Sequence, residues 1–163
     1  MIVVAYASKH GSTEGIAVAI ADRLQERGHR SIARPVEALD DLADADAVVL
    51  GSGVYAGSWL KDATAFVERH RDALARVPVW LFSSGPLGEQ VVDDEEQPRQ
   101  LAELREALSP RDHKVFCGAL DRSKLSFPER MIVKAVKAPD GDFRDWDAIA
   151  AWADSIADDL GAA

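Results

Sequence analysis

A chain of 163 residues, with 47% hydrophobic and 29% charged residues, is predicted to fold as one globular domain. A net charge of −9 excludes general nucleic-acid binding, and a single cysteine excludes an internal disulfide or a cluster of cysteine metal ligands. We expect a cytoplasmic protein without a metal site, a signal peptide or a membrane-spanning helix.

The chain begins with an apolar strand that runs into a polar turn and then into a helix. Residues 2–7 form a continuous apolar run, as in a parallel strand covered on both faces. The turn at 8–13 reads SKHGST, and a helix is predicted over 12–27. Free N–H groups at a helix N-terminus attract anions, so the turn predicts a phosphate site. Alternatively, Ser12 and Thr13 only cap the helix.

The composition of this turn narrows the kind of phosphate ligand. It lacks the GxxxxGK[ST] pattern that holds nucleoside triphosphates. Gly11 is its only glycine before Gly15, so the GxGxxG pattern of dinucleotide sites is also absent. Three hydroxyls remain, which suit a terminal monophosphate. Lys9 and His10 either contact that phosphate or point to solvent.

The rest of the chain alternates between strands and helices. This order favours a parallel α/β sheet in a single domain, 1–163, with no repeat and no linker. The tryptophans are expected in the core. We predict strands at 30–35, 47–51, 77–82 and 114–120, a brief helix at 38–42, and helices at 59–70, 99–108 and 146–160.

Three loops are predicted at the carboxyl ends of the strands, where open parallel sheets bind their ligands: 8–13, 52–58 and 83–88. The second loop places Tyr55 among small residues, and the third is rich in glycine. A phosphate turn, an aromatic platform and free backbone groups suit a mononucleotide with a planar head group. Tyr55 would either stack on that head group or be buried at the end of a strand.

Residues 121–144 do not fit the simple alternation and are predicted to be an inserted amphipathic segment. The sequence SFPE at 126–129 is a capping-box pattern that starts a helix. Residues 121–137 carry five basic and two acidic side chains, although the whole chain is acidic. The helix either packs its apolar side on the sheet or uses that side, with its basic residues, for docking.

Several motifs resemble the flavodoxin family. They are YASKHGST at 6–13 and VVLGSGVYAG at 48–57. Farther on, FCGAL at 116–120, RMIVKAV at 130–136 and DFRDWDAIAAW at 142–152 are similar to the branch that contains the menaquinone-dependent protoporphyrinogen dehydrogenases. The resemblance implies FMN as cofactor. It also implies an open five-stranded parallel sheet, in the order 2-1-3-4-5, with helices on both faces.

The resemblance also implies which positions hold FMN, since the motifs match position by position. The residues of the phosphate loop are Ser8, His10, Gly11, Ser12 and Thr13. Those of the first ring loop are Ser52, Gly53, Val54, Tyr55, Ala56 and Gly57, and those of the second are Ser84, Gly85, Pro86, Leu87 and Gly88. Residues 121–138 match an insertion that the branch associates with its membrane-linked, quinone-using activity.

Two functional hypotheses follow from the resemblance. In the first, the protein is an FMN-dependent oxidoreductase whose chemistry resides on the flavin, passing electrons between a hydrophobic reductant such as protoporphyrinogen and a quinone. Peripheral membrane contact through 121–137 would accompany this activity. In the second, it is a non-enzymatic electron carrier that docks on protein partners. A related cofactor, such as a deazaflavin, is a third interpretation. No protein nucleophile or general base is required.

Overall fold

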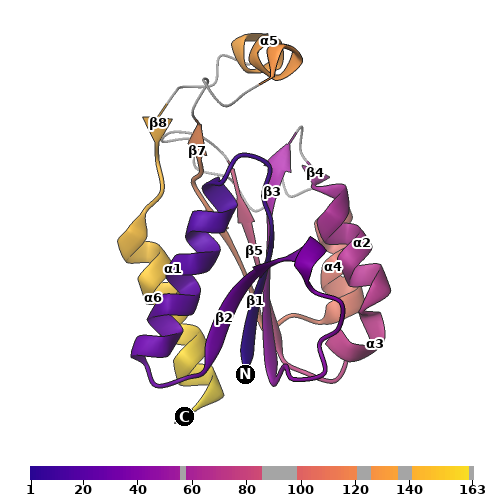
Figure 1. Ribbon diagram of the computed structural model, residues 1–163, viewed down its shortest axis with the longest axis vertical. Coiled ribbons are helices and arrows are strands. Elements are labelled where there is room, and N and C mark those ends of the chain that lie inside the picture. The colour runs from indigo at the N-terminus through magenta and orange to yellow at the C-terminus, as the bar shows by residue number, and fades with distance from the viewer. Residues whose placement is uncertain (56–57, 86–98, 121–125, 136–140, 162–163) are drawn as a thin grey trace.

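A parallel sheet with helices on both faces organises the chain (Figure 1). The computed structural model describes residues 1–55, 58–85, 99–120, 126–135 and 141–161. Its elements are β1 (Ile2–Ala7), α1 (Ser12–Glu26), β2 (Ser31–Pro35), a 3₁₀ turn (Val36–Ala38), β3 (Ala47–Tyr55), β4 (Ser58–Trp59), α2 (Lys61–Arg69), α3 (Arg71–Leu74), β5 (Val79–Ser84), α4 (Arg99–Leu108), β6 (Asp112–Phe116), β7 (Ala119–Leu120), α5 (Phe127–Ala135), β8 (Gly141–Asp142) and α6 (Trp146–Leu160).

The sheet confirms the predicted fold class. Within the described residues, its parallel strands follow the order β2-β1-β3-β5-β6, which is the expected 2-1-3-4-5 arrangement. Short β4 adds an antiparallel partner to the end of β3. Because the parallel strands all run the same way, their carboxyl ends meet at one edge of the sheet, which is where the predicted site lies.

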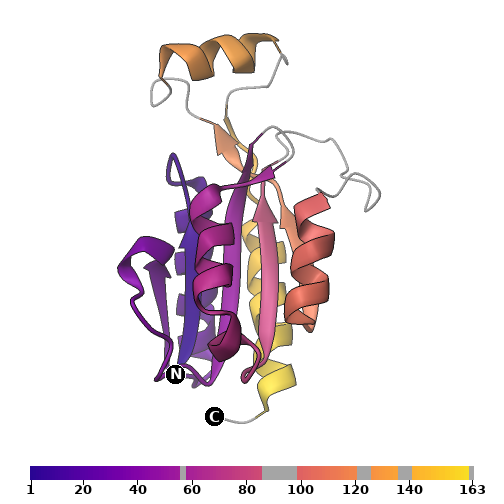
Figure 2. The same cartoon turned by 90° about the vertical axis from the view of Figure 1, so that its right-hand side faces the viewer.

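The continuous apolar run of β1 is explained by a core on each face of the sheet. Ile2, Val4 and Tyr6 pack toward α1 and α6, while Val3 and Ala5 belong to the core on the side of α2 and α4. Figure 2 shows α2 and α4 in front of the sheet and α6 behind it. Alternate side chains of a strand point to opposite faces, so a strand covered twice is apolar at every position.

Several predicted boundaries are wrong: the strand predicted at 77–82 is β5, which ends at Ser84, and the helix predicted at 59–70 begins at Lys61. Three further differences concern whole elements. The strand at 47–51 continues to Tyr55, because residues 54–55 pair with Ser58 and Trp59 in a hairpin. The brief helix predicted at 38–42 is a 3₁₀ turn at 36–38, directly after Pro35, whose φ of −65° is suited to such a start. The strand predicted at 114–120 divides into β6 and β7, and only β6 belongs to the main sheet.

The division of that strand places α5 outside the body of the fold. β7 pairs with β8 in a separate antiparallel ribbon, and α5 lies beyond the carboxyl ends of the strands, on the side opposite both termini (Figures 1 and 2). Phe127 is 75% exposed and Met131 is 54% exposed. For these two residues the expected packing of the apolar side on the sheet is therefore wrong.

The expectation of a core position holds for three of the four tryptophans. Trp59, Trp80 and Trp152 are buried, although Trp59 lies in β4 and not on a helix. Trp146 is 44% exposed. Its indole ring instead packs against the guanidinium of Arg144, with the Cζ atom 4.6 Å from the ring centroid.

Candidate functional site

The turn after β1 has the backbone geometry of an anion site. Gly11 has a φ of +89° and is the N-cap of α1, which begins at Ser12. No side-chain hydrogen bond caps this helix within the described residues. Ser12 and Thr13 are therefore helical residues and not caps, which excludes the capping alternative. The first N–H groups of α1 have no partner inside the helix, so they can bind an anion.

Hydroxyls of the turn hold it in shape and fix it to neighbouring strands. Ser8 Oγ accepts a hydrogen bond from the Gly11 amide at 3.1 Å. Ser12 Oγ accepts one from the Ala119 amide at 2.8 Å, which joins the start of α1 to β7. Thr13 is 2% exposed. A hydroxyl that accepts one hydrogen bond can still donate its proton, so Ser8 and Ser12 remain possible phosphate donors.

The ends of β3 and β5 lie beside each other and beside this turn. Gly53 pairs in register with Ser84. A Cβ atom at Gly53 would lie 3.3 Å from Thr13 Oγ1, and one at Gly85 would lie 3.2 Å from the Val54 carbonyl oxygen. Small residues at these positions are therefore needed for the close approach of the three segments.

Tyr55 ends β3 and is 40% exposed, so it is not a buried strand-end aromatic. The centroid of its ring lies 6.4 Å from that of His10 in an edge-to-face arrangement, and Lys9 Nζ lies 5.6 Å from the centroid. Burial of the ring, followed by the nearby charge of Glu129, raises the pKa of the Tyr55 phenol. The ring is thus a neutral, accessible platform next to the turn.

Ser52 and Ser84 contribute mainly to the framework. Ser52 is fully buried, and its Oγ donates to the Gly53 carbonyl at 2.9 Å and accepts from the Leu60 amide at 3.0 Å. Ser84 is 4% exposed. The hydrogen bonds of Ser52 hold the β3–β4 hairpin that carries Tyr55. The remaining predicted ring-loop residues lie outside the described part of the chain; they are Ala56, Gly57, Pro86, Leu87 and Gly88.

Glu129 of α5 is a residue of the site that sequence reasoning missed. Its carboxylate forms ion pairs with Lys9, at 3.3 Å, and with His10, and it accepts a hydrogen bond from Ser126 Oγ at 2.8 Å. Burial opposes ionisation, but the bonds from His10, Ser126 and Lys9 outweigh it and lower the pKa of Glu129 to about 2. The capping-box pattern suggested a local partner for Glu129 and gave no sign of the distant ones.

Sequence analysis also missed a second hydrogen-bond network, which supports the β3–β4 hairpin. Trp59 Nε1 donates to Ser83 Oγ at 2.8 Å, and His113 Nε2 lies 3.0 Å from the same oxygen. Arg105 Nη2 lies 3.1 Å from His113 Nδ1. Because arginine can only donate, Nδ1 accepts and Nε2 carries the proton that reaches Ser83. The network joins β4, β5, β6 and α4.

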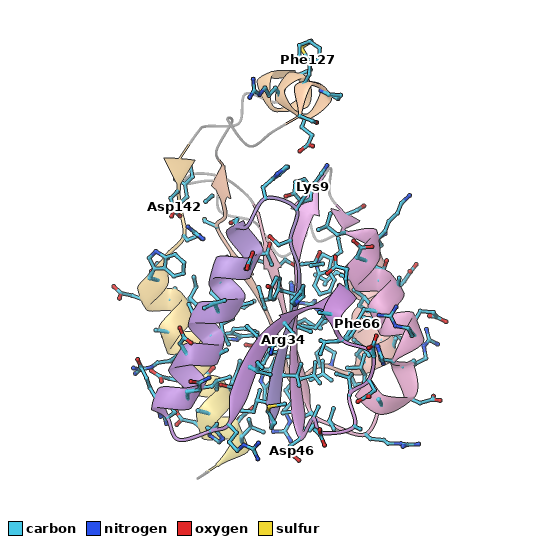
Figure 3. All side chains as sticks on the ribbon, in the orientation of Figure 1. Lys9, Arg34, Asp46, Phe66, Phe127 and Asp142 are labelled. Carbon is cyan, nitrogen blue, oxygen red and sulfur yellow. The ribbon has the colours of Figure 1, made fainter. Side chains whose placement is uncertain are left out.

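The arrangement as a whole fits a ligand with an anionic and a planar part. Helix N–H groups, hydroxyls and Lys9 belong to the turn, and the ring of Tyr55 lies next to it; Figure 3 shows Lys9 at the end of the molecule that carries α5. Within the described residues, no three His, Cys, Asp or Glu side chains gather closely enough to hold a metal ion. The helices described are all too short or too polar to cross a bilayer.

Comparison with known proteins gives a family and several structural relatives. The sequence pattern of the flavodoxin domain matches residues 3–147. Oxidised Flavodoxin 2 from Bacillus cereus superimposes with a TM-score of 0.65 and 22% identity, over 97% of this chain and 98% of that one. The flavodoxin of Streptococcus pneumonia TIGR4 gives 0.64 and 17%, over 97% and 98%.

A longer relative shares the same fold. The rubredoxin oxygen:oxidoreductase from Desulfovibrio gigas superimposes with a TM-score of 0.64 and 18% identity, over 98% of this chain. The chain spans only 35% of the length of that enzyme. None of the curated proteins matches this sequence. At these identities the structural likenesses establish the fold alone.

Proposed function

The chain belongs to the flavodoxin domain family, and on that premise we propose that it binds FMN and transfers electrons through the bound flavin. One observation carries the proposal. The uncapped N-terminus of α1, opened by the positive φ of Gly11, lies next to the exposed ring of Tyr55 at the end of β3. An anion site and an aromatic platform at one edge of a parallel sheet fit the two ends of a mononucleotide with a flat head group.

Each part of the site would have a defined task. The amides that open α1, with the hydroxyls of Ser8 and Ser12, would hold the phosphate. Tyr55 would stack on the ring, and the absence of side chains at Gly53 and Gly85 would let the ring approach the strand ends closely. The bound flavin supplies the redox chemistry, while the chain orients it and excludes water from one face.

Titration of the purified protein tests the cofactor directly. We expect FMN to bind with quenched flavin fluorescence and a shifted visible spectrum, and to bind more tightly than riboflavin, which has the same ring but no phosphate. A deazaflavin with and without its phosphate would serve as the parallel pair. A protein that fails to take up FMN, or binds riboflavin equally well, would contradict the proposal.

For the reaction, the exposed end of α5 supports an oxidoreductase that meets a hydrophobic substrate, with a quinone or a porphyrinogen as the class. Phe127 and Met131 are exposed beyond the carboxyl ends of the strands, on the same side as the site. An apolar surface there is suited to contact with a quinone, including one dissolved at a membrane surface. The cytoplasmic location predicted from the sequence agrees with such peripheral contact.

Substitution of both residues by serine tests this docking role and leaves Glu129 in place. We expect FMN binding to survive while the KM for a short-chain quinone rises. The control is Val18→Ser, because Val18 is an exposed apolar residue of α1. Unchanged quinone reduction in the double variant would refute the docking role.

The alternative is an electron carrier that docks on protein partners. The length of the chain supports this alternative. The match to Flavodoxin 2 from Bacillus cereus covers 98% of that protein, which is thus of similar size. The net charge of −9 would then steer the protein toward basic partners. Electron exchange that slows steeply with added salt, without turnover of small quinones, would favour this alternative.

A further inference from the structure

Polar contacts, and not burial, hold the described face of α5 to the body of the protein. The exposed fractions of Phe127 and Met131 show that these two side chains are not packed, and Figure 3 shows Phe127 on the side of α5 away from the sheet. On the side toward the sheet, Glu129 reaches Lys9 and His10, residues more than a hundred positions earlier in the chain. α5 is therefore attached through the turn at 8–13.

The carboxylate of Glu129 lies where an anionic ligand would be attracted. Lys9 and His10 directly precede Gly11, the N-cap of α1, and both lie in the turn. One oxygen of Glu129 contacts Lys9 and the other contacts His10. The charge of Lys9 is thus already neutralised, and the His10 ring already occupied, by a carboxylate of the same chain, which remains ionised at neutral pH.

We propose that Glu129 is a built-in competitor for the phosphate of the cofactor, which holds α5 over the turn until a bound phosphate displaces it. This inference rests on the proposed function. A phosphate at the N-terminus of α1 would carry up to two negative charges. It would attract Lys9 and repel the Glu129 carboxylate, which contacts both Lys9 and His10. Two anions cannot both lie next to Lys9 without a repulsive cost.

Displacement would couple occupancy of the site to the position of α5. Any ligand that binds one arrangement better than the other shifts the balance between them. An anionic ligand prefers the arrangement in which Glu129 has withdrawn, so α5 would be released on binding. A ligand without the phosphate has no such preference.

The variant Glu129→Gln tests the competition, since it removes the charge and keeps the size of the side chain. We expect FMN to bind about fivefold more tightly to this variant, the scale of one exposed ion pair. Riboflavin affinity should not change. The matched control is Glu103→Gln on α4, which removes the same charge from an exposed position of the body. It should leave both affinities unchanged.

The outcomes separate this inference from the proposed function. If FMN binds the wild type and Glu129→Gln equally well, or binds the variant more weakly, the competition is refuted and the cofactor assignment stands. If FMN binds neither protein, the cofactor assignment fails. In that case, inorganic phosphate serves as the probe, and its binding to the wild type and to Glu129→Gln is measured from the NMR shifts of the Gly11 and Ser12 amides. Tighter phosphate binding to the variant supports the competition, and equal binding refutes it.

Hydrogen exchange of the amides in α5 provides a second readout. In the wild type, FMN should accelerate exchange over residues 127–135, whereas riboflavin should not. Slower exchange with FMN would mean that the phosphate strengthens the attachment of α5, and would overturn the proposal. In Glu129→Gln, exchange of α5 should be fast before any ligand is added, because the ion pairs are already broken.

Discussion

Phe82 and Phe127 show how differently two regions of this molecule are built. Phe82 lies in β5 with no exposed surface, and its ring contacts those of Phe116 and Trp152 at centroid distances of 6.2 and 6.1 Å. Phe127, on α5, is 75% exposed. The body is held by packed apolar surface, while the far end of the molecule, which carries α5, contacts the body through the polar bonds of Glu129. The candidate site lies where the two regions meet.

The comparison teaches that stability and binding are separable in this protein. The body gains its stability from two cores that are independent of any ligand. The contacts between α5 and the turn involve partly exposed charges, which add little to stability but lie directly at the site. Substitutions in the body should therefore alter folding, and substitutions at the far end should alter binding.

The largest effect is expected for Phe82→Ala. Loss of the ring leaves a cavity beneath α6, and we expect the free energy of unfolding to fall by about 3–5 kcal/mol. Phe127→Ala removes the same atoms from an exposed position and should change it by less than about 0.5 kcal/mol. Denaturant unfolding of both variants gives the two values. Similar losses would mean that α5 is packed more firmly than its exposure indicates.

An intermediate effect is expected for Gly11→Ala, since Gly11 has a φ of +89° that only glycine adopts without strain. Alanine should lower the free energy of unfolding by about 1–2 kcal/mol, and the turn should distort to relieve the strain. We expect FMN affinity to fall about tenfold in consequence. Fluorescence titration measures the affinity for FMN.

Gly161→Ala is the matched control for that change. Gly161 follows α6, has a φ of +81°, and, like Gly11, has no neighbouring atom that a Cβ would meet. It should lose comparable stability and keep its FMN affinity. If the two variants bind FMN alike, the turn at 8–13 is not the phosphate site.

The body of this fold could be predicted from the sequence because its signals are local. The apolar run at 2–7, the apolar stripe of the first helix and the alternation of elements each depend on neighbouring residues. Together they were sufficient for the α/β class and for the turn between β1 and α1, whereas the strand order came from the family resemblance.

The far end, with α5, β7 and β8, could not be predicted from the sequence. Its contacts join residues that are distant in sequence, or they differ from what the local residue pattern predicts. The bond between Glu129 and His10 joins two segments whose proximity depends on where β7 and β8 leave the sheet. Trp146 was expected in the core on its hydrophobicity, but the guanidinium of Arg144, two positions earlier, packs on its ring at the surface. Neither arrangement has a pattern that can be recognised in advance.

The smallest effect is expected in the body, for an ion-pair network that joins α1 to α6. Asp154 accepts from Arg23 Nε at 2.8 Å and Nη2 at 3.0 Å, and from Arg27 Nη1 at 2.9 Å. The hydrogen bonds from Arg23, and then those from Arg27, lower the pKa of Asp154 to about 2. A carboxyl with a lowered pKa stabilises the fold above its ordinary pKa near 4, and that contribution disappears as the pH falls toward about 2.

Asp154→Asn should therefore be slightly less stable than the wild type at pH 7, with the difference narrowing at pH 3. It should also narrow at high salt, because these charges are partly exposed and screened. Asp159→Asn, an exposed position on the same helix, is the control. Denaturation midpoints at the two pH values measure the effect. A difference that stays constant with pH would mean that Asp154 acts through packing and not through its charge.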